Sequence, residues 1–290
     1  MNNIKKIVLF PNVNRDKGLV ITRKVGAILE KLGRDIAICP VFDDETYAYS
    51  PMSGFRFAEL DDELDGAEMI VSFGGDGTIL RAARAAIETG TPILGINMGG
   101  KGFMADLEVE EIDLIDSVAA GAYEIECRMM LDAEVIRGNE VICRDFALND
   151  IVIRGYNKMI ELSLYGDGQL ISEFSGDGAI IATPTGSTAY SMAAGGPIVE
   201  PSAQNIIITP ICAHVLEAKP YVLASDRRVS IEIGNKKNGP AYMSADGGRR
   251  ADILGKDVIN VKKSEKCTYL VHLSKRSFYK KVSEKLGEKS

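Results

Sequence analysis

The stretch AEMIVSFGGDGT, residues 67–78, decides the fold class that we predict for this chain. Residues 67–73 form an apolar run that predicts a buried β-strand. The sequence GGDGT at residues 74–78 ends that strand, and a helical pattern follows over Ile79–Glu88. A strand that passes through a glycine turn into a helix is the unit from which α/β proteins with parallel sheets are built.

The same alternation continues on both sides of this stretch. It predicts a doubly wound, Rossmann-like α/β domain, in which ligands bind at the carboxyl ends of the strands. Two glycine clusters stand at such ends, one at residues 74–78 and one at residues 99–102. The remaining predicted elements are strands at 4–10, 36–41 and 93–97, a helix at 18–32, and a mobile connection with one short helix at 43–65.

The pattern changes near Gly121. Short apolar runs separated by Gly, Asn and Asp turns dominate residues 123–273, which predicts a β-sandwich-like domain. We therefore expect an α/β domain at 1–121 and a β-rich domain at 122–274, with a C-terminal tail, 275–290, that can pack back onto the first domain. The predicted strands are 134–136, 140–144, 150–154, 160–165, 179–182, 205–209, 228–233, 258–261 and 268–273.

The composition excludes several classes of protein. The chain has 290 residues, with 34 Lys and Arg against 41 Asp and Glu, a net charge of −7. This acidic balance argues against a nucleic-acid binder, which needs clustered cations. No apolar run reaches the roughly 18 residues of a membrane span, so no membrane partner is expected. The five cysteines contain no CxxC pair, which predicts neither disulfides nor a thiolate metal site and favours a cytoplasmic location.

The GGDGT loop carries the sharpest chemical signal. Its glycines let the backbone approach a phosphate, and Thr78 can cap the helix start, where the dipole favours an anion. Asp76 is the odd member, because a carboxylate opposes phosphate binding unless it accepts a proton or positions a divalent metal. Spacing alone leaves two interpretations open: a phosphate loop with a catalytic carboxylate, or a tight turn whose aspartate only caps. The loop matches neither GxxxxGK[ST] nor GxGxxG.

The loop resembles the one shared by NAD kinases, by diacylglycerol and sphingosine kinases, and in variant form by 6-phosphofructokinases. Other segments choose among these families. They are LGINMGGKGF at 94–103, ALND at 147–150, SGDG at 175–178, ATPTGSTAYS at 182–191, AGGP at 194–197, TPIC at 209–212 and DGG at 246–248. They resemble NAD kinase motifs in order and in spacing, and on them the chain is identified as a member of the NAD kinase family.

The resemblance implies transfer of a phosphoryl group from ATP to the 2′-hydroxyl of the adenosine ribose of NAD, which gives NADP. Asp76 would accept the proton of that hydroxyl, with Gly77 beside it. Asp177 would reach a dinucleotide bound mainly by a neighbouring subunit, in a homodimer or homotetramer. The other NAD-binding residues implied are Asn149, Asp150, Thr188, Ala189, Tyr190 and Ser191. The implied contacts to ATP and its phosphates are Gly74, Gly75, Gly77, Thr78 and Lys101. A divalent metal, Mg²⁺, would come with ATP and lie with the phosphates over residues 74–78, and the resemblance assigns it no ligand residue.

The chain departs from the family pattern at a few positions. Gly100 and Lys101 stand where many members have an Arg and then an apolar residue, so the cationic donor has moved one position. Ser175 replaces a common basic residue, and Gly248 stands where Gln is frequent. None of these positions is the expected base.

Two alternatives from other classes are kept. A lipid kinase of the GGDGT type would need an acyl cleft and attraction to membranes, and the acidic charge argues against it. A regulator that binds a dinucleotide without turnover would conserve the same motifs, although an intact loop with Asp76 argues for catalysis. Turnover of NAD distinguishes the three.

Overall fold

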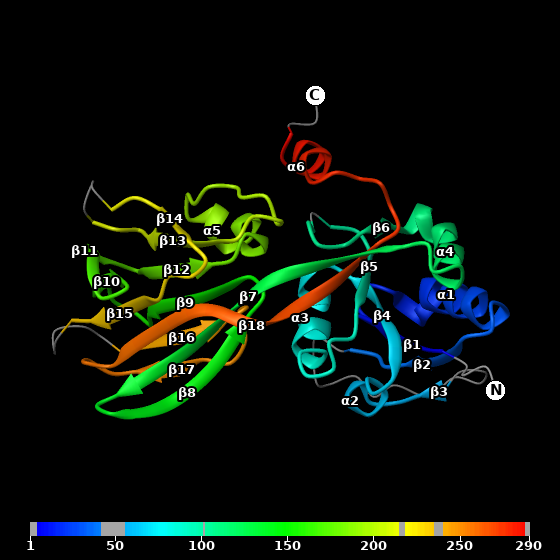
Figure 1. Cartoon of the computed structure of the whole chain (residues 1–290), viewed down its shortest axis with the longest axis horizontal. Coiled ribbons are helices and arrows are strands. Elements are labelled where there is room, and N and C mark those ends of the chain that lie inside the picture. The colour runs from blue at the N-terminus through cyan, green and yellow to red at the C-terminus, as the bar shows by residue number, and fades with distance from the viewer. Residues whose placement is uncertain (1–4, 42–55, 101, 215–217, 235–239, 288–290) are drawn as a thin grey trace. The chain divides into compact units, whose positions relative to one another are not determined.

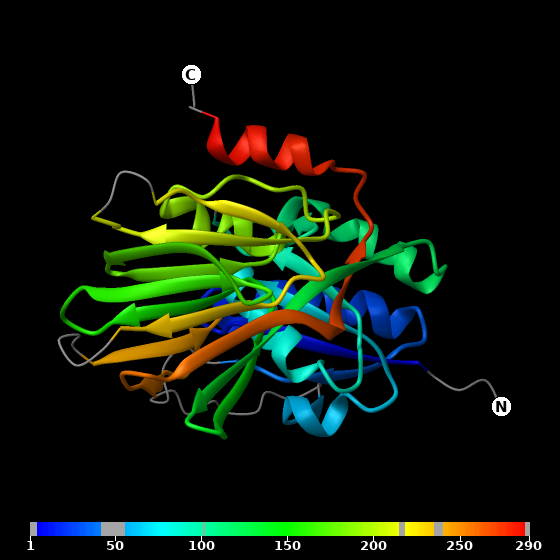
Figure 2. The same cartoon turned by 60° about the vertical axis from the view of Figure 1, so that its left-hand side comes forward.

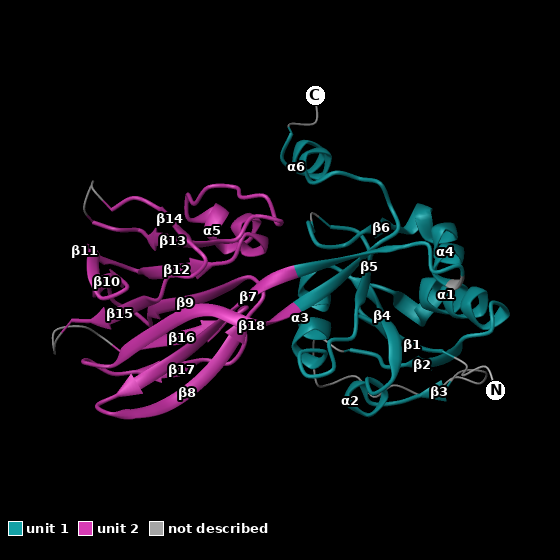
Figure 3. Cartoon of the chain, in the orientation of Figure 1, with its two compact units in different colours: residues 1–127, 268–290 teal, residues 128–267 magenta. Residues whose placement is uncertain are grey.

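The computed structural model describes residues 5–41, 56–100, 102–214, 218–234 and 240–287. The chain divides into two compact units, shown in Figure 3. Unit 1 contains residues 1–127 and 268–290, and unit 2 contains residues 128–267. The sequence placed the corresponding boundaries at 121/122 and 274/275. Because unit 2 is inserted into unit 1, the chain leaves unit 1 and returns to it.

Unit 1 is built on a parallel sheet (Figure 1). The order of its strands is β18-β5-β4-β1-β2-β3, in which β18 (Val258–His272) contributes its last residues, and every neighbouring pair is parallel. After β1, the chain adds β2 and β3 on one side of β1 and then adds β4 and β5 on its other side. The strand order therefore reverses between β1 and β4. Their bounds are β1 Lys6–Pro11, β2 Asp35–Ile38, β3 Arg56–Phe57, β4 Ala67–Gly74 and β5 Ile93–Asn97. Such a reversal opens a ligand-binding crevice at the carboxyl ends of the strands.

Helices cover both faces of this sheet, which explains why its strands are apolar throughout. On one face, Leu29 of α1 and Ile112 of η2 belong to a buried cluster with Ile7, Val71 and other strand residues. On the other face, α3 packs so closely that a Cβ at Gly95 would lie 2.6 Å from Ile79 Cδ1. The helices are η1 Lys17–Leu19, α1 Val20–Lys31, α2 Leu60–Glu63, α3 Asp76–Ala85, η2 Val109–Ile115, α4 Asp116–Ala119 and α6 Phe278–Leu286, and the short strand β6 Leu107–Glu108 pairs with β5.

Unit 2 is a sandwich of two sheets (Figures 1 and 2). One has the order β14-β13-β12-β9-β16-β17, and the other contains β11-β10-β15-β18 with β7 and β8. Buried side chains from strands of both sheets form one apolar cluster. The strands are β7 Glu124–Arg137, β8 Glu140–Ala147, β9 Asp150–Gly155, β10 Ile160–Gly166, β11 Gln169–Gly176, β12 Gly178–Ala182, β13 Asn205–Ile211, β14 Tyr221–Ala224, β15 Val229–Ile233, β16 Ala241–Ala245, β17 Ala251–Ile253 and β18 Val258–His272; η3 Thr185–Thr188 and α5 Tyr190–Ala193 follow β12.

The fold class agrees with the prediction: a doubly wound α/β unit and a β-sandwich-like unit. Several details of the predicted helices and strands were wrong. The helix after the glycine loop begins at Asp76 and not at Ile79, and β18 is one strand where the sequence suggested two. Strands β11, β14, β16 and β17 were missed. Of the predicted connection at 43–65, residues 42–55 lie outside the described residues, and the remainder contains β3 and the expected short helix, α2. No described helix is long and apolar enough to cross a membrane.

Candidate active site

The GGDGT loop joins β4 to α3 at the carboxyl edge of the parallel sheet. Gly75 is the N-cap residue of α3, with φ −116° and ψ −168°, and no side chain caps this helix start. The expected cap by Thr78 was therefore wrong: Thr78 lies inside the first turn and is buried. Its side chain explains Gly74, because a Cβ at Gly74 would lie 2.2 Å from Thr78 Oγ1.

The other two glycines of the loop have no such packing reason. A Cβ added at Gly75 or Gly77 would meet no described atom within 4 Å. Neither residue has the positive φ that favours glycine. Gly77 is exposed and Gly75 is half-buried, and both lie at the start of a 10-residue helix. What glycine provides at these two positions is close access to the backbone N–H groups of the first turn, which is what an anionic ligand uses.

Asp76 connects the two glycine clusters. Its Oδ2 accepts a hydrogen bond from the Phe103 N–H at 2.8 Å, and its Oδ1 accepts one from the Met104 N–H at 3.1 Å. The same carboxylate explains Gly102, where a Cβ would lie 2.5 Å from Asp76 Oδ1. Asp76 is therefore more than a helix cap: it holds the second cluster against the first. Lys101 lies outside the described residues.

Asn97, which the sequence analysis did not single out, ends β5 beside Gly74. It is 3 % exposed. Its Nδ2 donates to the Gly100 carbonyl at 3.2 Å and to Glu108 Oε2 at 2.7 Å. Its Oδ1 is buried with no hydrogen-bond partner among the described residues. The only sequence signal for this residue was its place at the end of a buried strand, just before a glycine cluster.

In unit 2, the turn at residues 148–150 is held by one carboxylate. Asp246 accepts hydrogen bonds from the N–H groups of Leu148 at 2.8 Å, Asn149 at 2.7 Å and Asp150 at 3.1 Å. In return the Asp246 N–H donates to the Asp150 carbonyl at 2.9 Å. Asp246 adopts φ +50° and is followed by Gly247 at φ +68°. The DGG motif was recognised in the sequence, but this role of its aspartate was not foreseen.

A second segment locks onto the same turn. Thr183 Oγ1 donates to the Leu148 carbonyl at 2.6 Å, and the Thr183 N–H donates to the Asn149 carbonyl at 2.9 Å. Thr183 Oγ1 also accepts from the Gly186 N–H at 3.0 Å. Gly186 lies so close that a Cβ there would be 2.0 Å from the Asn149 carbonyl oxygen. These contacts fix the backbone conformation of Asn149.

Asp150 is the titratable group of this turn. It is 5 % exposed. Burial, together with the negative charge of Asp246, raises the pKa of Asp150 to about 7. Near neutral pH its carboxyl group can therefore accept a hydrogen bond as a carboxylate or donate one as the acid.

The four residues at 188–191 differ in how deeply their side chains are buried. Ser191 is fully buried, with its Oγ 2.8 Å from Thr209 Oγ1. Tyr190 packs partly buried against an apolar cluster that includes Val152 and Ile207. Thr188 Oγ1 donates to the Thr185 carbonyl at 3.2 Å, and Ala189 is half-buried between them. Ser191 therefore reaches a ligand only through its neighbours.

Asp177 stands apart from these residues, between β11 and β12. Its side chain is 40 % exposed, and Oδ2 lies 3.6 Å from Nη2 of Arg154. The flanking glycines, Gly176 and Gly178, are required by packing, because a Cβ on either would meet backbone atoms at 2.8 Å or less. The predicted site residues thus form a group around Asp76 in unit 1 and a group around Asn149 in unit 2, with Asp177 at the surface of unit 2.

Comparisons with known proteins agree with this chemistry. The model of the ATP-NAD kinase N-terminal domain matches residues 49–123, and that of the C-terminal domain matches residues 148–273. An NAD kinase of Ruminiclostridium cellulolyticum is 35 % identical over 99 % of both chains, and one of Natranaerobius thermophilus is 37 % identical over 98 % of both.

Two solved structures are similar in fold. The crystal structure of yeast NADH kinase complexed with NADH has a TM-score of 0.84 at 24 % identity, covering 100 % of this chain and 89 % of that one. An NAD kinase from Archaeoglobus fulgidus in complex with ATP has a TM-score of 0.74 at 25 % identity, covering 97 % and 98 %.

The matched domains and the relatives indicate a phosphotransferase with an alcohol group as acceptor. The matched models and the relatives show that the chain belongs to the ATP-NAD kinase family. Its activity is the transfer of the ATP γ-phosphoryl group to the adenosine ribose 2′-hydroxyl of NAD, which gives NADP. Nothing in these findings favours a lipid kinase or a regulator without turnover.

Proposed function

We propose that Asp76 is the residue that accepts the proton of the 2′-hydroxyl during this transfer. The supporting observation is its position: a half-buried carboxylate at the start of α3, fixed by two backbone N–H donors, beside two glycines with open space around them. Each carboxylate oxygen has two lone pairs, so the two N–H bonds leave acceptor capacity for a hydroxyl. In phosphoryl transfer the protein itself does little covalent chemistry. The rate acceleration comes from alignment of the two substrates and from removal of the hydroxyl proton.

The remaining residues divide between the substrates. Asn149 and Asp150 bind NAD, because a rigid turn with a carboxyl group suits the paired hydroxyls of a ribose. Thr188, Ala189 and Tyr190 line the dinucleotide site, and Ser191 supports them from the interior. Gly74, Gly75, Gly77 and Thr78 form the loop for the ATP phosphates, with Lys101 as the cation. Access to the N–H groups at Gly75 and Gly77 supports this assignment.

The divalent metal, Mg²⁺, belongs to ATP in this proposal. Among the described residues, no group of three or more His, Cys, Asp or Glu side chains could hold a metal ion. Mg²⁺ is often coordinated mainly by substrate phosphates, and we assign it to those of ATP. When bound, it would neutralise charge on the transferred phosphoryl group.

Assembly and location complete the proposal. The enzyme forms a homodimer or homotetramer, in which the exposed Asp177 reaches a dinucleotide bound mainly by a neighbouring subunit. It acts in the cytoplasm, in keeping with the free state of all five cysteines. Light scattering gives the oligomeric state, and a monomer with full activity would contradict the role of Asp177.

The central experiment is turnover of Asp76→Asn. Purified protein is incubated with NAD, ATP and Mg²⁺, and NADP is measured with an NADP-specific dehydrogenase. The variant keeps the size of the side chain, so NAD binding should persist while kcat falls by roughly two to four orders of magnitude, the usual weight of a positioned base. Asp113→Asn, at an exposed position of η2, is the matched control. Near-normal kcat in Asp76→Asn would remove Asp76 from the reaction.

A further inference from the structure

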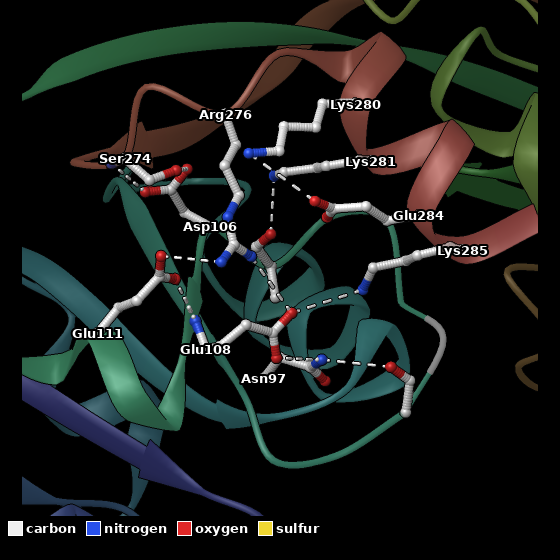
Figure 4. A network of polar contacts seen from close by, with 12 residues as sticks. Asn97, Asp106, Glu108, Glu111, Ser274, Arg276, Lys280, Lys281, Glu284 and Lys285 are labelled. Atoms are coloured by element: carbon white, nitrogen blue, oxygen red, sulfur yellow. Dashed lines mark hydrogen bonds and ion pairs between the residues drawn. The ribbon is translucent and has the colours of Figure 1, made fainter. Parts of the chain in front are cut away.

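The segment 102–108 lies between Asp76 and the C-terminal part of unit 1. On one side, its Phe103 and Met104 N–H groups hold the Asp76 carboxylate. Its other contacts run to β5, where the Asp106 N–H donates to the Gly95 carbonyl at 3.0 Å, and to the C-terminal residues 272–286. Figure 4 shows several of these contacts. Whatever fixes this segment also fixes the donors that orient Asp76.

Among the side chains of the C-terminal part of unit 1, the one that contacts the segment nearest to those donors is Lys281 on α6. Its Nζ donates to the carbonyl of Ala105, the residue after Met104, at 2.8 Å (Figure 4). The two residues are 176 positions apart in the sequence, so this bond exists only in the folded unit.

The burial of Lys281 is unusual for this helix. Tyr279 is 66 % exposed and Leu286 43 %, and Lys281 is the one buried residue of α6, at 9 % exposure. An ammonium group loses hydration on burial, so a helix held by packing alone would bury an apolar side chain there. The burial of this lysine indicates that the N–H donors of its ammonium group form hydrogen bonds in the folded unit.

Further contacts hold the rest of the segment. Asp106 accepts hydrogen bonds from the N–H groups of Leu273 and Ser274, each at 2.8 Å. Glu108 is approached by Arg276 at 3.7 Å and by Lys285 at 3.8 Å (Figure 4). These contacts involve residues 106 and 108, farther along the chain from Met104 than Ala105 is. Among these side chains, Lys281 acts closest to the amides that contact Asp76.

We propose that Lys281 is a positioning residue for phosphoryl transfer, because its bond to the Ala105 carbonyl sets the backbone of Phe103 and Met104 and thereby the orientation of the Asp76 carboxylate. The inference rests on the proposed role of Asp76. It gives the C-terminal helix a part in the reaction although, as assigned here, none of its residues contacts a substrate.

The test uses four variants of the full chain. Lys281→Met removes the donor and keeps the length of the side chain, whereas Lys281→Arg keeps a donor. Lys280→Met is the control on the same helix, since Lys280 is 62 % exposed and lies 3.9 Å from Glu284. The fourth is the double variant of Lys281→Met with Asp76→Asn. Thermal melting is measured beside kcat and KM, and Lys281→Gln replaces Lys281→Met if the latter is unfolded at the assay temperature.

We expect Lys281→Met to lower kcat about 10- to 100-fold, the effect of a displacement of about 1 Å at the reacting groups, while KM for NAD changes little. Lys281→Arg should restore most of kcat, and Lys280→Met should match the wild type. In the Asp76→Asn background, Lys281→Met should cause no further loss, because both changes act through one carboxylate.

Two outcomes overturn the inference. A lower melting temperature with normal kcat would make Lys281 a structural residue, and losses that multiply in the double variant would show that it acts independently of Asp76. If Asp76→Asn alone turns over normally, the proposed role of Asp76 fails instead, so the two failures are distinguishable.

Discussion

The two groups of site residues are ordered in different ways. In unit 2, the turn at 148–150 is held by Asp246 and Thr183, which follow β16 and β12, both strands of the sheet that contains β9. In unit 1, Asp76 is held by two backbone amides of segment 102–108, which pairs with β5 through β6 and is also fixed by residues near the C-terminus. The first group is held directly by residues that follow strands of one sheet. The second is held by a segment that joins the parallel sheet through β6 and also depends on polar contacts with the C-terminal part of unit 1.

The largest expected effect tests the group in unit 2. Gly186→Ala places a Cβ 2.0 Å from the Asn149 carbonyl oxygen, and only movement of the backbone relieves that overlap. We expect a loss of roughly 3 kcal/mol in the free energy of unfolding and no measurable NAD binding. Urea denaturation and calorimetric titration measure the two.

The glycine loop supplies the matched control. A Cβ at Gly77 meets no described atom within 4 Å, so Gly77→Ala should not reduce stability and can raise it by about 0.4–1 kcal/mol through the unfolded state. If glycine serves ligand access there, KM for ATP should rise in the same variant. Equal destabilisation by both substitutions would remove the contrast between the two groups.

Asp246→Ala should have the next largest effect. It removes the acceptor for three N–H groups of the turn, and we expect a loss of about 1–3 kcal/mol in the free energy of unfolding. KM for NAD should rise with it, while Asp246→Asn, which keeps one acceptor oxygen, should lose less. A variant with unchanged KM would show that the turn does not contact NAD.

The pH dependence of stability in Asp150→Asn tests the unit 2 group further. Because burial and Asp246 raise the pKa of Asp150 to about 7 from 3.8, the folded state binds this proton more tightly than the unfolded state does. The wild type therefore loses stability from this group as pH rises from about 4 to about 7, and the loss stays constant above. The variant should melt at a higher temperature than the wild type at pH 8 and show little difference near pH 4. A difference independent of pH would contradict this assignment.

The smallest expected effect concerns His272 in unit 1. Its Nδ1 lies 2.9 Å from Asp106 and its Nε2 lies 2.8 Å from Glu126. Hydrogen bonds to these carboxylates raise the pKa of His272 above 6.5. The stabilisation is complete below pH 6.5 and is lost as pH rises through the higher native pKa.

His272→Gln should thus lower the melting temperature at pH 6 and have a smaller effect at pH 9. The wild type and the variant are compared in melts across that range. A constant difference would mean that packing, and not the charge of His272, is what the substitution removes.

The sequence predicted the parts of the fold that local patterns specify. β5 was placed at Ile93–Asn97, where the structure has it, because a strand buried on both faces is a short continuous apolar run. β16, with the sequence AYMSA, was missed since its small and polar residues lack that pattern. β18 was divided because the charged run from Lys262 to Lys266 hid its continuity.

Prediction of the site was limited in the same way, to what local patterns specify. The motifs pointed to Asp76 and Asn149, but the partners that fix them lie far away in sequence. The Phe103 amide is 27 residues from Asp76, and Asp246 is 97 residues from Asn149. Hydrogen bonds to backbone amides leave no residue pattern, and Lys281 looked like one more charge on an exposed helix. Such partners emerge only with the tertiary structure.

The separation between Ala105 and Lys281 also has a consequence for biosynthesis. A ribosome that adds about 5–20 residues per second reaches Lys281 roughly 9–35 s after Ala105, because 176 positions lie between them. Asp246 and the whole of unit 2 are translated within that interval. Every residue that holds the turn at 148–150 is therefore synthesised before Lys281, which is among the last of the residues that hold the segment next to Asp76.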